Sequence, residues 1–203
     1  MTSTQPQPIV RDVDREFFDR ELASFVPERI FDAHCHLWNA DHYQVKLAGM
    51  PRDAGYDEYR EMIDALHPGR SVRALFIPMP SQAEVIPRAN DWIAKQTGKA
   101  ADCRGLFFVR PDDDPEWVRQ EVRRLGLCGL KCYHTMSPIK PTWEASIETF
   151  LPEKFLSVAN EEGWAITLHL VKSRAVADGE NIACIRRYCQ TYPNMKLILA
   201  HSA

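Results

Sequence analysis

The feature that most constrains this chain is the alternation of short apolar segments with amphipathic helical patterns. Six segments follow one another: RIFDAHCHLW, VRALFIPMP, RGLFFVRP, GLCGLKCY, WAITLHLV and MKLILAHS. All are far shorter than the ~20 apolar residues that a membrane-spanning helix needs. Strands that are buried on both faces and separated by helices are typical of a parallel sheet covered by helices. The sequence therefore predicts an α/β fold.

Helix signals lie between these segments. Asp114 is suited to cap a helix that begins at Pro115, and Gly126 follows its last apolar position. A second helix is expected from Tyr56 to Leu66, inside the long connection between the first two strands. The sequence thus predicts helices in the connections between strands, as parallel strand connections require.

The chain is expected to contain a short leader and one domain. Residues 1–28 form a polar leader and a helix, in which Phe18 and Phe25 are predicted to share one face. Residues 29–203 hold the six strands, and residues 39–70 form a long insertion after the first. A long excursion at the C-terminal end of a barrel strand commonly covers an active site. We therefore interpret residues 39–70 as a substrate-covering loop.

Composition limits the classes of partner. The 25 Lys and Arg residues against 28 Asp and Glu give a formal charge of -3, which provides no basic field for nucleic acid or an anionic membrane. The N-terminus lacks the apolar core of a signal peptide, and the six cysteines form no C-x-x-C pair. We expect a cytoplasmic protein that acts on a small molecule without nucleic-acid or membrane partners, and assembly into a homo-oligomer stays open.

A histidine pair in the first strand is the first candidate for chemistry. Strand alternation sends Asp32, His34 and His36 to one side. Two neutral imidazoles placed in this way can bind one divalent ion, and Asp32 can orient a ring or the backbone behind them. The alternative is a chance pair on a solvated face, which the apolar strand disfavours.

Two further histidines lie near strand ends. His169 is in the fifth predicted strand and His201 closes the sixth. Either one alone would usually be a hydrogen-bonded core residue. In a parallel barrel, however, the C-terminal ends of all strands open onto the same face. The sequence therefore favours one site shared by all four histidines.

These motifs, in this order, resemble the amidohydrolase superfamily, in particular its amidohydrolase-related branch of single-metal TIM-barrel hydrolases and decarboxylases. The resemblance rests on the H-x-H of His34 and His36, on Lys131 in G-L-K, on His169 and on the A-H at His201. It implies a (β/α)8 TIM-barrel fold.

The resemblance also implies a set of roles. His34, His36 and His169 would bind one divalent metal ion, with zinc expected, and His201 would be the catalytic group acting on water or substrate. The remaining ligand in the family is an aspartate after the eighth strand. Because the sequence contains about six of eight strand-helix units, we expect residues 29–203 to form an incomplete metal-dependent hydrolase barrel.

Three residues are candidates for substrate binding. Lys131 would bind a substrate carboxylate in a single-metal site, although some two-metal relatives carry a carboxylated lysine at this strand. The structural alternative is a charge that snorkels or pairs within the barrel mouth. Trp38 could form a wall of the pocket or simply pack between barrel and loop. His134 follows the fourth strand and could contact the substrate.

The expected activity is hydrolysis of an amide, ester or lactone by a metal-activated water. One alternative is metal-dependent, non-oxidative decarboxylation of an aromatic or unsaturated acid. A second is that the chain is an inactive truncated fragment, or a subunit that binds metal or a partner. One and two metal ions are not distinguished by the sequence.

Overall fold

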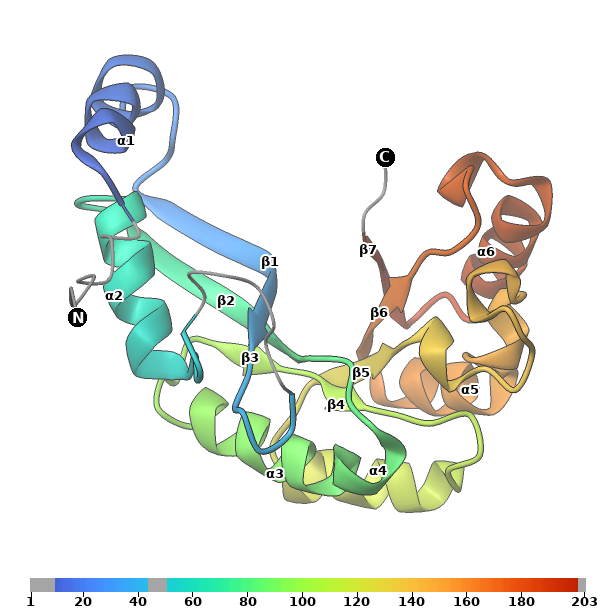
Figure 1. The fold of residues 1–203 in the computed structure, drawn as a ribbon. Coiled ribbons are helices and arrows are strands. Elements are labelled where there is room, and N and C mark those ends of the chain that lie inside the picture. The colour runs from blue at the N-terminus through green and yellow to red at the C-terminus, as the bar shows by residue number, and fades with distance from the viewer. Residues whose placement is uncertain (1–9, 44–50, 201–203) are drawn as a thin grey trace, which may run out of the picture.

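The computed structural model describes residues 10–43 and 51–200, in which strands and helices alternate (Figure 1). The strands are β1 (Arg29–Leu37), β2 (Ser71–Pro78), β3 (Arg104–Gly105), β4 (Phe107–Phe108), β5 (Gly129–Cys132), β6 (Ala165–His169) and β7 (Lys196–Ala200). The α-helices are α1 (Asp12–Phe17), α2 (Tyr56–Leu66), α3 (Ile86–Thr97), α4 (Pro115–Arg124), α5 (Glu153–Glu162) and α6 (Gly179–Thr191). In these ranges no helix is long and apolar enough to cross a bilayer; the cytoplasmic location stays a prediction.

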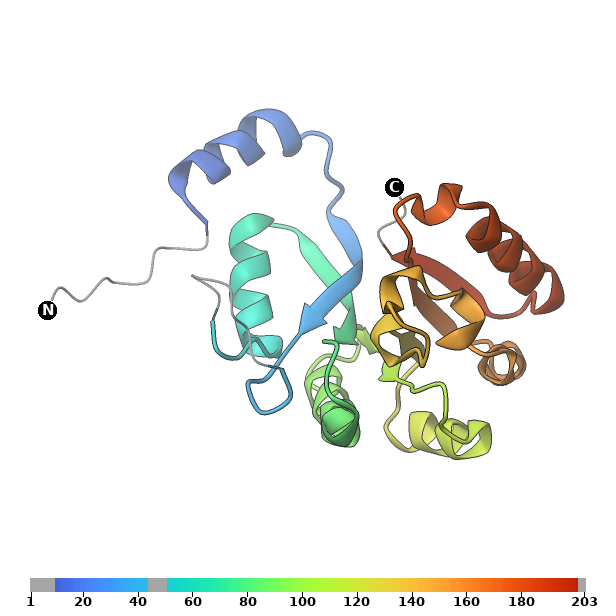
Figure 2. The ribbon, with the colours of Figure 1, turned by 45° about the vertical axis from the view of Figure 1, so that its right-hand side comes forward.

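All strand pairs are parallel, and their order in space follows their order in the chain. β1, β2 and β3 form one hydrogen-bonded group, and β4 to β7 form another. The strands curve into one wall with α2 to α6 along its outer side, while β1 and β7 lie at opposite ends (Figures 1 and 2). This arrangement confirms the predicted α/β class and forms part of a (β/α)8 barrel.

The third predicted strand is divided at Leu106. β3 pairs with β2, whereas β4 pairs with β5, so the chain changes partner between them. The Leu106 amide donates to the carbonyl oxygen of Phe76 at 3.0 Å and joins the two groups. Gly105 is needed beside this junction because a Cβ there would lie 2.4 Å from Thr97 Oγ1.

Strand alternation separates an outer core from an inner one. Outward residues such as Phe76, Leu130 and Ile166 belong to the large cluster that packs beneath the helices. A small inner cluster contains Leu75, Ile77 and Leu106, against which Cys128, Ala165 and Ile198 pack. Because neighbouring residues of a strand face opposite sides, the residues next to Leu130 and Ile166 face the interior of the curved wall.

Helix α4 begins and ends as predicted. The Asp114 carboxylate accepts a hydrogen bond from the Trp117 amide at 2.8 Å, and Pro115 is the first helical residue. Gly126 follows the helix with a φ of 65°, a left-handed conformation that glycine adopts without strain.

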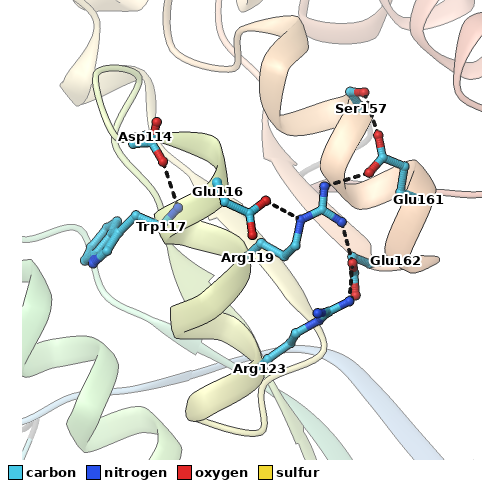
Figure 3. A network of polar contacts seen from close by, with 8 residues as sticks. All are labelled: Asp114, Glu116, Trp117, Arg119, Arg123, Ser157, Glu161 and Glu162. Atoms are coloured by element: carbon cyan, nitrogen blue, oxygen red, sulfur yellow. Dashed lines mark hydrogen bonds and ion pairs between the residues drawn. The ribbon is translucent and has the colours of Figure 1, made fainter.

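An ion network on the outer surface joins α4 to α5 (Figure 3). Arg119 donates to Glu116 at 2.9 Å, to Glu161 at 2.6 Å and to Glu162 at 2.5 Å. Arg123 also donates to Glu162, at 2.7 Å. The network fixes two successive helices against each other, so its charges have a structural role.

The long insertion is described only in part. Its predicted helix is confirmed as α2, with the predicted bounds Tyr56–Leu66. After the insertion leaves β1, Trp38 pairs through its backbone with Ala54. Residues 44–50 lie outside the described residues, and the substrate-covering role stays a prediction.

The prediction for the first helix was wrong at Phe25. Phe18 is buried and its ring packs edge-on to His67, whereas Phe25 is 84% exposed. The reason is that α1 continues as a π-helical turn over Phe18–Leu22. A π-turn spaces residues differently from an α-helix, so the α-helical face predicted for Phe18 and Phe25 does not persist.

Candidate metal centre

Most of the predicted site residues lie at the C-terminal ends of three strands. His34 and His36 are in the last part of β1, Lys131 is in β5, His134 is just beyond it, and His169 ends β6. The C-terminal ends of parallel barrel strands open onto the same face. These strand positions fit a shared face, and the single site formed by these residues stays a prediction.

The two histidines of β1 point toward each other. Their Nε2 atoms are 3.1 Å apart and their ring planes are inclined at 61°. The pairing of β1 with β2 shifts register between Asp32 and Cys35, immediately around His34. The Asp32 carboxylate accepts a hydrogen bond from the His34 amide at 2.9 Å and so orients the backbone at this bulge.

This pair fits a divalent cation by its donor atoms and by their spacing. Two nitrogens bound to one tetrahedral zinc ion at ~2.0–2.1 Å would lie roughly 3.3 Å apart, close to the separation between His34 and His36. His36 Nδ1 lies 3.3 Å from the carbonyl oxygen of Ile77. A proton on Nδ1 can be donated to that oxygen, which leaves Nε2 as the lone-pair donor.

His169 belongs to a second group of rings. Its ring centroid is 5.7 Å from that of Tyr133 and 5.1 Å from that of His134. His134 in turn packs edge-on to Trp143, and its Nδ1 lies 3.1 Å from Thr142 Oγ1. Burial lowers the pKa of His134, which favours its neutral form. A neutral imidazole can both donate and accept a hydrogen bond.

The end of β2 connects the two histidine groups. The Tyr133 hydroxyl donates to the carbonyl oxygen of Pro78 at 2.6 Å. The preceding residue, Ile77, supplies the carbonyl that faces His36. His36 and Tyr133 therefore contact successive carbonyls of one strand, and Tyr133 contacts His169.

Lys131 is the buried cation of this region. Its side chain is 0% exposed, and its Nζ has no hydrogen-bond partner among the described residues. Nζ lies 4.8 Å from the ring centroid of Tyr133. Burial lowers the pKa of Lys131 to about 8, because an ammonium loses its hydration in the interior.

The described residues do not complete a metal site. Within residues 10–43 and 51–200, no group of three or more His, Cys, Asp or Glu side chains is arranged to hold an ion. His201 lies outside the described residues, so its catalytic role stays a prediction. The ligand role of His169 also stays a prediction.

Trp38 packs against the returning part of the long insertion. Its Nε1 donates to the carbonyl oxygen of Pro51 at 3.2 Å. With His42 and Trp92 it lines a hollow of about 10 Å³, which has room for about one water molecule. These contacts fit the packing alternative, and substrate contact by Trp38 stays a prediction.

A larger hollow of about 470 Å³ lies beside the loops after β2, β4 and β5. Its lining consists of Ala83, Arg110, Pro111, Asp112, Met136, Pro138 and Thr149. Its volume is in the range of small-molecule sites. Arg110 donates a hydrogen bond of 2.7 Å to Asp113. This ion pair raises the pKa of Arg110 and neutralises its charge.

Tyr133 and Thr167 were not predicted as site residues from the sequence. Tyr133 lies two residues after Lys131, and Thr167 lies two residues before His169. Residues two apart on a strand share a face, so the same alternation that paired His34 with His36 could have identified them.

Comparisons with known proteins agree with this architecture. The amidohydrolase family model matches residues 31–203. The structure of 2,6-dihydroxybenzoate decarboxylase from Rhizobium is similar, with a TM-score of 0.53 and 15% identity over 86% of this chain and 66% of that one. Dihydroorotase from Saccharomyces cerevisiae, in complex with 5-fluoroorotic acid, gives a TM-score of 0.50 and 17% identity over 85% of this chain and 47% of that one.

The chain thus spans less than two thirds of the length of either structure. At these identities the similarity shows the barrel fold. No curated protein matches the chain in sequence.

Proposed function

The chain belongs to the amidohydrolase family, and from that premise we propose that its strand ends form the metal centre of an enzyme that hydrolyses an amide, ester or lactone bond of a small molecule. The observation that carries the proposal is the convergence of His34 and His36, whose Nε2 atoms are 3.1 Å apart. Their strand pairs with β2, and its residues Cys35 and Leu37 are buried in the same core as Tyr59 and Ile63 of α2, so the fold positions the rings.

His34, His36 and His169 would hold the ion, and we propose zinc because imidazole nitrogens suit it. Such an ion supplies Lewis acidity, which lowers the pKa of water and polarises a carbonyl group. A single ion is proposed because the motifs resemble the single-metal branch of the family, and the described part of the chain brings two imidazoles together on β1.

The protein's own residues supply orientation and proton transfer. The Ile77 carbonyl fixes the ring of His36, and Asp32 fixes the backbone behind His34. His134 is half-buried just after β5, and burial lowers its pKa and favours the neutral form, which can hydrogen-bond a substrate. The proposed proton-transfer residue is His201.

Decarboxylation of an aromatic or unsaturated acid is the second candidate. The observation that favours it is the buried ammonium of Lys131, since a carboxylate is the natural partner of a buried cation. The two reactions can share one metal centre, so they must be separated by their products.

Metal content tests the centre. We expect purified chain to retain about one zinc ion after dialysis, as a single tetrahedral site would, and His34→Ala to lose it. The matched control is His67→Ala, because His67 follows α2 at the opposite end of β2 from Ile77. Elemental analysis measures the zinc content of all three proteins. Zinc retained by His34→Ala would refute the proposed metal site.

Product analysis tests the reaction. Metal-loaded protein is incubated with a panel of lactones, esters and amides and, separately, with aromatic carboxylic acids. Hydrolysed product from the first panel supports the proposal. Carbon dioxide released only from the second panel replaces hydrolysis with decarboxylation, and no turnover in either panel with zinc bound indicates a metal-binding subunit.

A further inference from the structure

Two neighbouring polar atoms of the barrel interior lack partners. Lys131 on β5 and Thr167 on β6 are paired in register. Each is 0% exposed, and neither Lys131 Nζ nor Thr167 Oγ1 has a hydrogen-bond partner among the described residues. Two buried residues with unpartnered hydrogen-bond donors thus occupy paired positions on adjacent strands.

The Lys131 side chain extends toward the C-terminal end of β5, on the side of the candidate metal centre. Tyr133 lies beyond Lys131 in the direction of the C-terminal end of β5, and Nζ lies 4.8 Å from the centroid of its ring. That ring is itself held in place, because its hydroxyl donates to the Pro78 carbonyl. Nζ therefore points toward the end of the strands where the histidines lie.

The two atoms define the chemistry of a suitable ligand. A buried, unpaired ammonium is costly, so a lysine at this position calls for an anionic partner. Nζ and Oγ1 can donate to the two oxygens of a carboxylate, and one positive charge balances its single negative charge. A dianionic phosphate would need further positive charge, and Arg110 on the adjacent loop is already paired with Asp113.

We propose that Lys131 and Thr167 form a carboxylate-binding subsite on the inner side of the candidate metal centre, and that the substrate is a carboxylic acid. This inference rests on the proposed function. It does not decide whether the substrate is hydrolysed or decarboxylated. It requires that Lys131 remains an ammonium and does not become a carbamate.

Binding of a fluorinated pair of probes tests the subsite. We would titrate the full chain with 4-fluorobenzoate and with its neutral analogue 4-fluorobenzamide, and follow both by fluorine NMR. A charge-assisted hydrogen bond is the larger contribution, so we expect the benzoate to bind at least about tenfold more tightly. Lys131→Met should abolish this preference, and Thr167→Val should reduce benzoate affinity about two- to tenfold.

Lys95→Met is the matched control, because Lys95 is an exposed lysine of α3; it should bind both probes as wild type does. Thermal melting confirms that each variant is folded. Thr167→Val, which replaces a hydroxyl by a methyl group of similar size, keeps the test valid if Lys131→Met fails to fold.

All titrations are repeated with EDTA, so that binding is measured without metal or turnover. A benzoate preference that depends on Lys131 in EDTA supports the subsite even where the metal or activity assays fail. Equal affinity for the two probes, or an unchanged preference in Lys131→Met, overturns it. A lysine carbamate, seen by carbon NMR after equilibration with labelled bicarbonate, would also overturn it.

Discussion

The two halves of the barrel wall present their histidines in different ways. In the half made by β1 and β2, His34 and His36 face each other, and a backbone carbonyl holds one ring. In the half made by β5 and β6, His169 lies among aromatic rings, and Lys131 is buried on the adjoining strand. The first half is suited to grip a cation, whereas the second also offers a positive charge to an anion.

The paired charge of Arg119 on the outer side of the wall contrasts with the unpaired charge of Lys131 inside it. The guanidinium of Arg119 donates hydrogen bonds to Glu161 and Glu162, which raise the pKa of Arg119 and pair its charge between two helices. Lys131 is more deeply buried and has no such partner among the described residues. A paired charge on the outside explains packing, while an unpaired charge inside requires a functional explanation.

The largest expected effect is on the pH dependence of stability. Burial lowers the folded-state pKa of Lys131 to about 8, against about 10.4 when unfolded. Between these values the unfolded chain binds more protons than the folded chain, so stability rises with pH, by roughly 3 kcal/mol. Lys131→Met lacks this rise and should be the more stable protein at pH 7. Urea unfolding of both proteins from about pH 7 to 10 measures it, and parallel profiles would contradict the buried ammonium.

A smaller change in the free energy of unfolding is expected for Tyr133, whose hydroxyl joins the two halves of the wall. Tyr133→Phe removes the donor to the Pro78 carbonyl and should lower the free energy of unfolding by about 1–2 kcal/mol, because a buried acceptor loses its partner. If this contact aligns the halves, zinc affinity should also fall. Urea unfolding and zinc titration of the same variant measure both quantities. Unchanged zinc affinity would show that the halves are positioned independently of Tyr133.

The smallest effect is expected on the outer surface. Arg119→Met removes two ion pairs between α4 and α5 and one within α4 and should cost about 1 kcal/mol or less, because solvent screens such pairs. Zinc content and benzoate binding should not change. A large loss of either would mean that the outer network, too, shapes the strand ends.

Local signals predicted part of this molecule well. The cap at Asp114 and the apolar spacing of α2 determine helix bounds through neighbours in the chain. The convergence of His34 and His36 followed from strand alternation, although the bulge after Asp32 was not foreseen.

Features that depend on partners distant in sequence were not predictable. The strand break at Leu106 depends on which neighbour each residue joins. The pairing of Lys131 with Thr167 depends on the register of β5 against β6. A single sequence does not specify register, since many alignments of two apolar strands bury the same residues.

We expect both halves of the wall to contribute ligands to one metal centre. X-ray absorption spectroscopy of the zinc-loaded chain, beside His169→Ala, tests it most directly, because the spectrum reports the imidazole nitrogens around the ion. We expect three imidazole ligands in the wild type and one fewer in His169→Ala. Identical zinc spectra of the two proteins would show that His169 is not a ligand, and that the ion belongs to the β1 half alone.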